Sequence, residues 1–361
     1  MFRESIQKMA PYQPGEQPRP GERLIKLNTN ENPYPPSPRV RRAIARAAAG
    51  SALRLYPAPR ADDFIGKAAR LYGVAKSNII AGNGSDELLA MVFRATLDPG
   101  DTVAYPVPTY SLYDTLAAIQ EARVLRFRLR GDFSVPLDEL AGARARLTIV
   151  CNPNSPSGTL TPAKHLDKLA RRLRGRLLVI DEAYVDFAEE NSLGLLRRNR
   201  NVVILRSLSK SFSLAGMRLG LCFASPPVIE SLLKVKDSYN LSRIALAAGT
   251  AALTDTAWMS RNVARVKRTR ARSEVRLRKM GFEVPVSQAN FVLARFPGQN
   301  LAPVAKGLRR AGILVRYFPN PLLSDALRIS IGTGAEMASL FRALAPLVRP
   351  LAAARRNGVL R

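Results

Sequence analysis

The sequence has 361 residues, of which 47% are hydrophobic, and its 56 Lys and Arg residues against 28 Asp and Glu residues give a formal net charge of +28. This length suffices for one large domain and a smaller one, with the apolar content of an ordinary globular protein. No uninterrupted apolar run reaches about 18 residues and the N-terminus has no apolar signal-peptide core, which excludes a membrane span and a secretion signal, so we expect a soluble, cytoplasmic protein.

Residues that bind metals or form disulfides are scarce. Cys151 and Cys222 lie in or beside apolar runs, and the single histidine, His165, lies in a sequence typical of a surface helix. We therefore expect neither a disulfide nor a metal site. The basic residues are spread over many helices without interleaved aromatic residues or a nucleic-acid-binding motif. We interpret the charge as an arginine-rich surface without a specific nucleic-acid or membrane partner, and a basic nucleic-acid-binding protein is the alternative.

The first third of the chain begins with an arm. Residues 1–38 are rich in proline and polar residues, which predicts an extended segment. Helices are predicted over 39–49 and 62–72. From residue 78 onward strands alternate with helices, the pattern of a mostly parallel sheet covered on both faces. The predicted strands are 78–81, 102–105, 123–127, 147–151, 177–180, 202–206 and 219–223.

The last third is mainly helical at first, with a long basic helix near 257–280. An α+β portion follows, with strands near 290–296, 313–317 and 326–331. We predict an N-terminal arm with the start of a small domain (1–45), a large domain (46–260) and a C-terminal small domain (261–361).

Lys210 lies in the stretch SLSKSFSLAGMR, just beyond the apolar strand 202–206. Ligands of open α/β sheets bind beyond the carboxyl ends of the strands. The hydroxyls of Ser207 and Ser209 flank the lysine, and Arg218 follows. An amine, hydroxyls and a guanidinium suit a phosphorylated aldehyde such as pyridoxal phosphate, because the amine forms a Schiff base while the other groups hold the phosphate. A solvated Lys and Arg at a strand end is the alternative.

Two further strand ends carry polar residues. Asp181 ends an apolar strand, where a buried carboxylate needs a partner such as a protonated pyridine nitrogen, and Tyr184 follows it. In the turn GNGSDE, the amides of Ser85 and Asp86 are free to bind a phosphate at a helix start. Helix capping is the alternative for both sites.

Several other residues suit the same ligand. Tyr110 is a candidate for stacking on a pyridine ring, or else a core aromatic. The turn CNPNSPSG, residues 151–158, carries amide and hydroxyl donors for the phenolic oxygen of the cofactor. Arg316 and Arg328 lie in apolar strands, where a substrate carboxylate or phosphate would satisfy them; structural salt bridges are the alternative.

These motifs occur along the chain in the order known from one enzyme family. The chain resembles the fold type I pyridoxal-phosphate-dependent aminotransferases, most closely the histidinol-phosphate enzymes, over nearly its whole length. That family has a large α/β domain with a mostly parallel sheet, a smaller α+β domain and an extended N-terminal arm. The matching stretches are PYQPG, NENP, LYP, GNGSDE, YPVPTY, NPNSPSG, DEAY, SLSKSF, LAGMRLG, NFVLARF, GILVR and LRISIGT.

The resemblance implies a role for each matching residue. Lys210 forms the Schiff base, Asp181 pairs with the pyridine nitrogen and Tyr184 binds the phenolic oxygen O3. Tyr110 stacks on the ring. The implied phosphate ligands are Ser85, Asp86, Ser207, Ser209, Arg218 and Tyr56. In this family the tyrosine that matches Tyr56 comes from the partner subunit, so the resemblance also implies a homodimer. The implied substrate ligands are Arg328 for the carboxylate, Arg316 and Tyr12 for the phosphate end, and Asn32.

One position departs from the family pattern. Ser155 stands where an asparagine usually precedes Pro-Thr-Gly, so the O3 contact comes from Ser155, from Asn154 or from Tyr184 alone. The implied reaction is a ping-pong amino transfer between glutamate/2-oxoglutarate and histidinol phosphate/imidazole-acetol phosphate, a step of histidine biosynthesis. An aromatic aminotransferase and a threonine-phosphate decarboxylase on the same fold are the alternatives.

Overall fold

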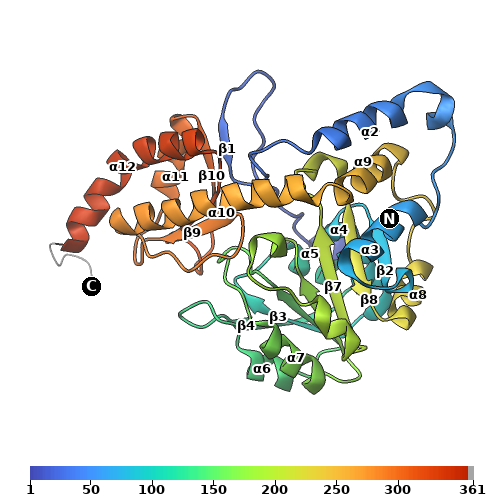
Figure 1. Ribbon diagram of the computed structural model, residues 1–361. Helices are drawn as coiled ribbons and strands as arrows, with labels where there is room; N and C mark the ends of the chain where they lie inside the picture. The colour runs from blue at the N-terminus through green and yellow to red at the C-terminus, as the bar shows by residue number, and fades with distance from the viewer. Residues whose placement is uncertain (357–361) are drawn as a thin grey trace.

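The computed structural model describes residues 1–356 and contains two β-sheets (Figure 1). The larger sheet has seven strands in the order β2-β8-β7-β6-β5-β3-β4. All neighbours are parallel except that β8 runs antiparallel to β7 and to β2, which confirms the predicted α/β class with a mostly parallel sheet. The strands are β2 (Ile79–Gly82), β3 (Thr102–Val107), β4 (Arg123–Arg128), β5 (Leu147–Cys151), β6 (Leu177–Asp181), β7 (Val202–Ser207) and β8 (Gly220–Ala224).

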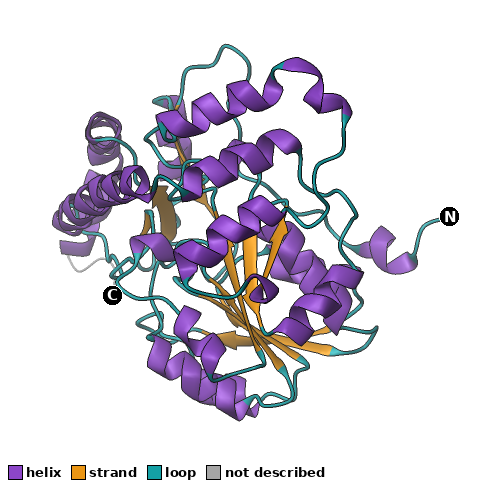
Figure 2. Ribbon diagram, turned by 45° about the vertical axis from the view of Figure 1, so that its right-hand side comes forward, coloured by secondary structure: helices purple, strands orange, loops and turns teal. Residues whose placement is uncertain are grey.

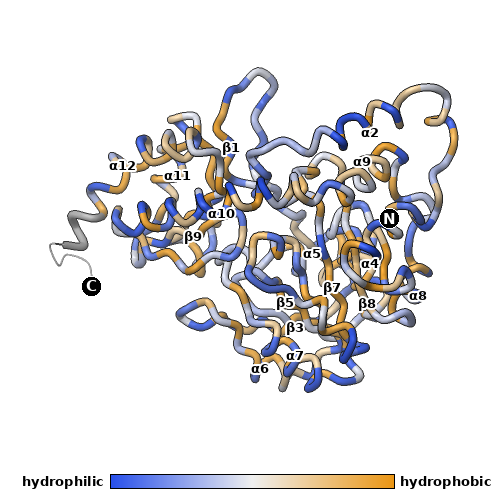
Figure 3. The backbone as a smooth tube through the Cα atoms, viewed as in Figure 1, coloured by the Kyte–Doolittle hydropathy of each residue, from blue (hydrophilic) through white to orange (hydrophobic). Residues whose placement is uncertain are grey.

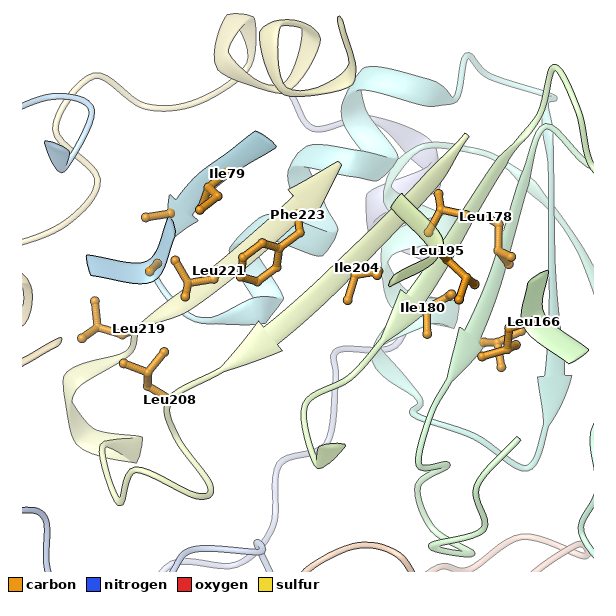
Figure 4. Packing of buried hydrophobic residues seen from close by; sticks show 14 of the residues in the cluster. Ile79, Leu166, Leu178, Ile180, Leu195, Ile204, Leu208, Leu219, Leu221 and Phe223 are labelled. Carbon is orange, nitrogen blue, oxygen red and sulfur yellow. The ribbon is translucent and has the colours of Figure 1, made fainter. Parts of the chain in front are cut away.

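Helices cover both faces of this sheet (Figure 2). Successive residues of a strand point to opposite faces, so the apolar central strands present apolar side chains on both faces. Ile180 and Ile204 belong to one buried cluster, part of which is drawn in Figure 4, whereas Val179 and Val203 belong to another. The first cluster includes residues of α2 (Pro38–Ala48), α3 (Asp62–Tyr72), α6 (Leu137–Gly142), α7 (Ala163–Arg172) and α9 (Arg243–Leu253). The second includes residues of α4 (Ser85–Thr96), α5 (Leu112–Ile119) and α8 (Pro226–Lys234). Near-continuous apolar strands are typical of such doubly covered sheets.

The smaller sheet has the order β1-β10-β11-β9 and a hydrophobic core of its own. Apolar residues of β9 and β11 pack with residues of the long helix α10 and of the C-terminal helices. The elements are β1 (Ile25–Leu27), β9 (Phe291–Arg295), β10 (Ile313–Tyr317), β11 (Ala326–Ser330), α10 (Thr256–Lys279), α11 (Ala302–Arg310) and α12 (Gly334–Arg356). Short 3-10 helices lie at η1 (Gly50–Arg54), η2 (Lys76–Asn78), η3 (Val185–Phe187), η4 (Leu193–Arg197) and η5 (Ala215–Met217).

The N-terminal arm differs from the predicted extended segment. It begins with a short helix, α1 (Glu4–Lys8), and later contributes β1, which pairs in parallel with β10. This pairing depends on a strand almost 300 residues away, so no local pattern reveals it. The arm is anchored at two places: Arg3 near its start donates to Glu121 after α5, and Glu16 and Glu22 in its middle pair with Arg309 of α11.

The predicted division at residues 45 and 260 stays a prediction. The helix α10 crosses position 260, and β1 in the arm belongs to the same sheet as the C-terminal strands. Figure 3 shows apolar residues concentrated along the strands and hydrophilic residues along α2 and the turns. Within residues 1–356, no helix combines the length and the apolar character needed to cross a membrane.

Candidate active site

A cavity of about 700 Å³ lies at the carboxyl edge of the large sheet. The last residues of three adjacent parallel strands, Cys151 of β5, Asp181 of β6 and Ser207 of β7, all line it. The smaller sheet closes the other side, because residues of β10 and β11 line the same cavity. The structure brings thirteen predicted residues to this wall: Tyr12, Ser85, Asp86, Tyr110, Ser155, Asp181, Tyr184, Ser207, Ser209, Lys210, Arg218, Arg316 and Arg328.

One corner of the cavity is built by a tight approach of backbone to backbone. Gly84 precedes α4 with φ of 84°, and a Cβ atom there would lie 2.6 Å from Nη2 of Arg218. A Cβ atom on Gly220 would lie 2.6 Å from the amide nitrogen of Ser85. Glycine is therefore required at both positions, next to the start of a 12-residue helix whose first residues, Ser85 and Asp86, line the cavity.

Arg218 and hydroxyl groups complete this corner. Its guanidinium donates to Asp86 (Nη2 to Oδ2, 3.0 Å) and, at 3.5 Å, to the Ser209 hydroxyl. The Tyr110 hydroxyl donates to the other carboxylate oxygen of Asp86 at 3.2 Å. Burial, followed by the Asp86 charge, raises the pKa of Tyr110 well above its usual value, so the phenol stays neutral. A guanidinium, helix amides and hydroxyls together form an anion site.

Asp181 presents a buried carboxylate whose side-chain and backbone donors are both neutral. The Tyr113 hydroxyl donates to Oδ2 at 2.8 Å and the amide of Ala183 donates to Oδ1 at 3.2 Å. Asp181 is only 3% exposed, and burial raises its pKa to about 6. A cationic ligand would offset the cost of keeping this carboxylate ionised.

Lys210 lies beyond β7 with its amine in the cavity. Nζ donates to the carbonyl of Thr29 at 3.3 Å and lies 5.7 Å from the ring centroid of Tyr184. Burial, assisted by the charge of Arg328, lowers the pKa of Lys210 to about 8. The neutral amine, which is the nucleophilic form, is therefore more populated near neutral pH than in an ordinary lysine.

Tyr184 is held by a residue of the arm. Its hydroxyl accepts a hydrogen bond from Nδ2 of Asn30 at 3.1 Å, and its ring meets the edge of Phe291 at 5.0 Å. Burial raises the pKa of Tyr184 to about 12, so it donates as a neutral phenol.

Of the two candidates for the O3 contact, only Ser155 lines the cavity. Its hydroxyl accepts from Nη1 of Arg328 at 3.0 Å. The amide group of Asn154 is used within the loops instead: Nδ2 donates to the carbonyl of Pro108 and to Ser157, and Oδ1 accepts from Thr109.

The two predicted substrate arginines differ in what they contact. Arg328 also donates through Nη2 to the carbonyl of Asn28 at 2.9 Å, while its buried Nε has no partner. Arg316 donates to two arm carbonyls, those of Pro14 at 3.0 Å and Gln13 at 2.9 Å. Arg328 therefore retains a free donor, whereas Arg316 holds the arm, from which Tyr12 approaches Tyr110 edge to face at 6.0 Å.

Besides Asn154, two further predicted residues lie outside the cavity wall. Tyr56 is 77% exposed and stacks on Tyr239 with ring centroids 4.4 Å apart. Asn32 lies behind the lysine, where Nδ2 donates to the carbonyls of Lys210 at 3.0 Å and Ser211 at 3.2 Å. Asn32 thus contacts the backbone that carries Lys210.

Sequence reasoning missed three contributors: Thr29, Asn30 and Tyr113. Asn30 belongs to the NENP stretch and adopts φ of 59°, a left-handed conformation that asparagine tolerates. Tyr113 lies in the first turn of α5, and its ring meets the ring of Tyr110 edge to face at 5.7 Å. The contact of Thr29 is made by its backbone and leaves no signal in the sequence.

Comparisons with known proteins agree with this geometry. The family model described as aminotransferase class I and II matches residues 22–344. Histidinol-phosphate aminotransferase 1 of Nostoc sp. is 47% identical over 96% of this chain and 98% of its own length. Histidinol-phosphate aminotransferase of Citrifermentans bemidjiense is 46% identical over 96% and 98%.

A solved structure is similar as well. The crystal structure of histidinol-phosphate aminotransferase from Sinorhizobium meliloti in complex with pyridoxal-5'-phosphate superposes with a TM-score of 0.89 at 27% identity, covering 97% of this chain and 98% of that one. These matches confirm the predicted family and enzyme class and favour them over a nucleic-acid-binding protein. The chain therefore belongs to the class I and II aminotransferases and, within them, to the histidinol-phosphate aminotransferases.

Proposed function

We propose that this chain is a pyridoxal-phosphate-dependent aminotransferase that exchanges an amino group between glutamate/2-oxoglutarate and histidinol phosphate/imidazole-acetol phosphate. One observation carries the proposal: a buried amine with a lowered pKa, Lys210, shares a cavity with the Asp181 carboxylate and with the anion site at Arg218. The relatives named histidinol-phosphate aminotransferase support the choice of substrates.

The donor set of the cavity fits pyridoxal phosphate. The corner at Arg218 and the start of α4 suits a phosphate, and a Cβ atom at Gly84 or Gly220 would fill that corner. The raised pKa of Asp181 suits a ring nitrogen that becomes cationic beside it. When bound, the cofactor supplies an aldehyde that condenses with amines and a ring that withdraws electrons from the substrate carbon.

The protein residues would then bind, orient and move protons. The amine of Lys210 would hold the cofactor and would carry a proton to and from the substrate Cα. Asp181 would keep the ring nitrogen protonated, and Tyr184 and Ser155 would donate to the phenolic oxygen. Tyr110, which lies across the cavity, would cover the ring.

The substrates differ at one end, a carboxylate in glutamate and a phosphate ester in histidinol phosphate. Arg328 suits the α-carboxylate of glutamate because its buried Nε is without a partner. Arg316, with Tyr12 on the arm, would receive the variable end. Each Nη of Arg316 uses one N–H for the arm and has a second, so the guanidinium could still donate to either anion.

We further propose a homodimer in the cytoplasm. Leu53, Leu55 and Tyr56 form an exposed apolar stretch before α3, and Tyr56 does not line the cavity of its own chain. Pairing with a second copy would cover this stretch and bring Tyr56 to the other subunit's phosphate site.

Two assays test this function. Lys210→Ala is expected to abolish turnover and the visible absorbance band of the bound cofactor, whereas Lys164→Ala, at an exposed position of α7, is expected to keep both. A retained band in Lys210→Ala would contradict the assignment. Glutamate formation from 2-oxoglutarate is expected to be fastest with histidinol phosphate as donor; a faster reaction with phenylalanine, or CO₂ release from threonine phosphate, would support the alternative enzymes.

A further inference from the structure

The two segments that carry the main cavity residues have a second set of polar side chains on their other side. After β6, Asp181 and Tyr184 line the cavity, but Glu182 and Asp186 do not. At the end of β7, Lys210 lines the cavity, but the neighbouring Arg206 and Ser211 do not. These residues, which do not line the cavity, contact each other behind its wall.

The centre of this second set is a buried ion pair. Glu182 Oε2 accepts from Arg206 through Nε at 3.0 Å, and Nη2 lies 2.9 Å from the same oxygen. The two side chains are 0% and 8% exposed. The other oxygen of Glu182 accepts from the amide of Ser192 at 2.5 Å, and the guanidinium lies over the ring of Tyr72, 4.9 Å from its centroid.

Asp186 extends the pair to the lysine segment. Its Oδ1 lies 4.0 Å from Nη1 of Arg206, and its Oδ2 accepts a hydrogen bond from the hydroxyl of Ser211. Ser211 directly follows Lys210. The Lys210 segment is therefore held on one side by Asp186 and on another by the amide of Asn32, which binds the carbonyls of Lys210 and Ser211.

A buried ion pair of this kind adds little net stability, because desolvation of both charges offsets most of their attraction. Its directional hydrogen bonds, in contrast, link the two segments at a defined distance and orientation. The pair joins the segment after β6 to β7 directly, and Asp186 and Ser211 carry the link onward to Lys210.

We propose that Glu182, Arg206 and Asp186 act as positioning residues that fix Lys210 relative to Asp181, through the hydrogen bond between Asp186 and Ser211. This inference rests on the proposed roles of Lys210 and Asp181 at the two ends of one cofactor. A fixed separation matters because a misplacement of about 1 Å at a reacting group lowers a rate by as much as about 100-fold.

Two variants weaken the link on either side of Asp186 and leave the Glu182–Arg206 pair in place. Ser211→Ala removes the hydrogen bond, and Asp186→Asn keeps an acceptor for Ser211 but removes the charge facing Arg206. Both are expected to lower kcat about 10-fold or more with KM changed less than about 3-fold, because the reacting amine is misaligned while substrate contacts persist. Both are also expected to weaken the induced circular dichroism of the bound cofactor, which reports its fixed orientation.

A matched control is Asp167→Asn on α7, another mostly buried carboxylate, which accepts hydrogen bonds from Arg171 and Asn199 away from the cavity. It is expected to leave kcat and the cofactor dichroism unchanged. If Ser211→Ala and Asp186→Asn lower only the melting temperature and keep the dichroism and kcat of the unmodified protein, the cluster is merely structural and the inference is wrong. Absence of any cofactor band in the unmodified protein would instead refute the proposed function, and this inference with it.

Discussion

Replacing Asp181 by asparagine is expected to stabilise the cofactor-free protein while disabling the enzyme. The carboxyl is almost completely buried, and its pKa is raised from an ordinary 3.8 to about 6. Between these pH values the native state binds more protons than the unfolded state. The contribution of this group to stability is therefore fully present below about pH 4 and is lost as the pH rises through 6.

The size of the effect follows from the shift. At about 1.4 kcal/mol per pKa unit, the difference between 3.8 and about 6 amounts to about 3 kcal/mol at neutral pH. This is an upper limit for Asp181→Asn, because an amide cannot accept from both Tyr113 and Ala183 as the carboxylate does. Turnover is expected to fall about 100-fold or more, since a preorganised charge at the cofactor is lost.

The assay is urea unfolding of the cofactor-free protein at pH values from 4 to 8. The unmodified protein is expected to lose stability relative to Asp181→Asn across this range, and the variant to be the more stable at pH 7.5. Asp325→Asn is a control that is expected to lower the free energy of unfolding, because it removes the ion pair of Asp325 with Arg295 at 2.7 Å. Equal or lower stability of Asp181→Asn at pH 7.5, with an unchanged pH slope, would refute the reasoning.

Three further predictions concern the same cavity. The rate at which cofactor-free protein condenses with added pyridoxal phosphate is expected to rise with a midpoint near pH 8, because burial lowers the pKa of Lys210 to about 8. Stopped-flow absorbance measures this rate, and a midpoint above pH 10 would contradict the burial of the amine. Gly220→Ala is expected to weaken cofactor affinity about 10-fold or more, since the added Cβ meets backbone 2.5 Å away, whereas Gly142→Ala, with no atom within 4 Å, leaves the titrated affinity unchanged. The Tyr56→Ala and Lys210→Ala proteins are each expected to be impaired alone. When they are mixed and exchange subunits, about a quarter of the sites should combine an intact Lys210 with an intact Tyr56 and become active. No recovery of activity would contradict a shared site.

Much of the cavity could be predicted because its residues follow apolar strands. The runs that became β6 and β7 end at Asp181 and Ser207, and parallel strands place their carboxyl ends at one edge of a sheet. The predicted strands of the large sheet end within two residues of the observed ones. The choice between Ser155 and Asn154 was left open, since adjacent residues of an irregular turn have no periodicity that assigns them a direction.

Contacts between distant segments were not predictable in the same way. Asn30 and Tyr184 are 154 positions apart, and the partners of Arg316 lie about 300 positions before it in the arm. Such pairs leave no periodic signal, because the pattern around each residue reflects only its local secondary structure and not its distant partner. The Glu182–Arg206 pair is a further example: either residue alone reads as an ordinary charge beside a strand.

The sequence by itself thus determined the α/β class, the order of the strands along the chain and the group of polar residues at their ends, because hydrophobic periodicity and strand-end chemistry are local. Only the tertiary structure decided which of those groups meet. It placed β1 in the small sheet, turned Ser155 toward the cavity and Asn154 away, and paired Glu182 with Arg206 behind Lys210. The physical reason is that burial and hydrogen-bond satisfaction are properties of the packed chain, in which residues far apart in sequence supply each other's partners.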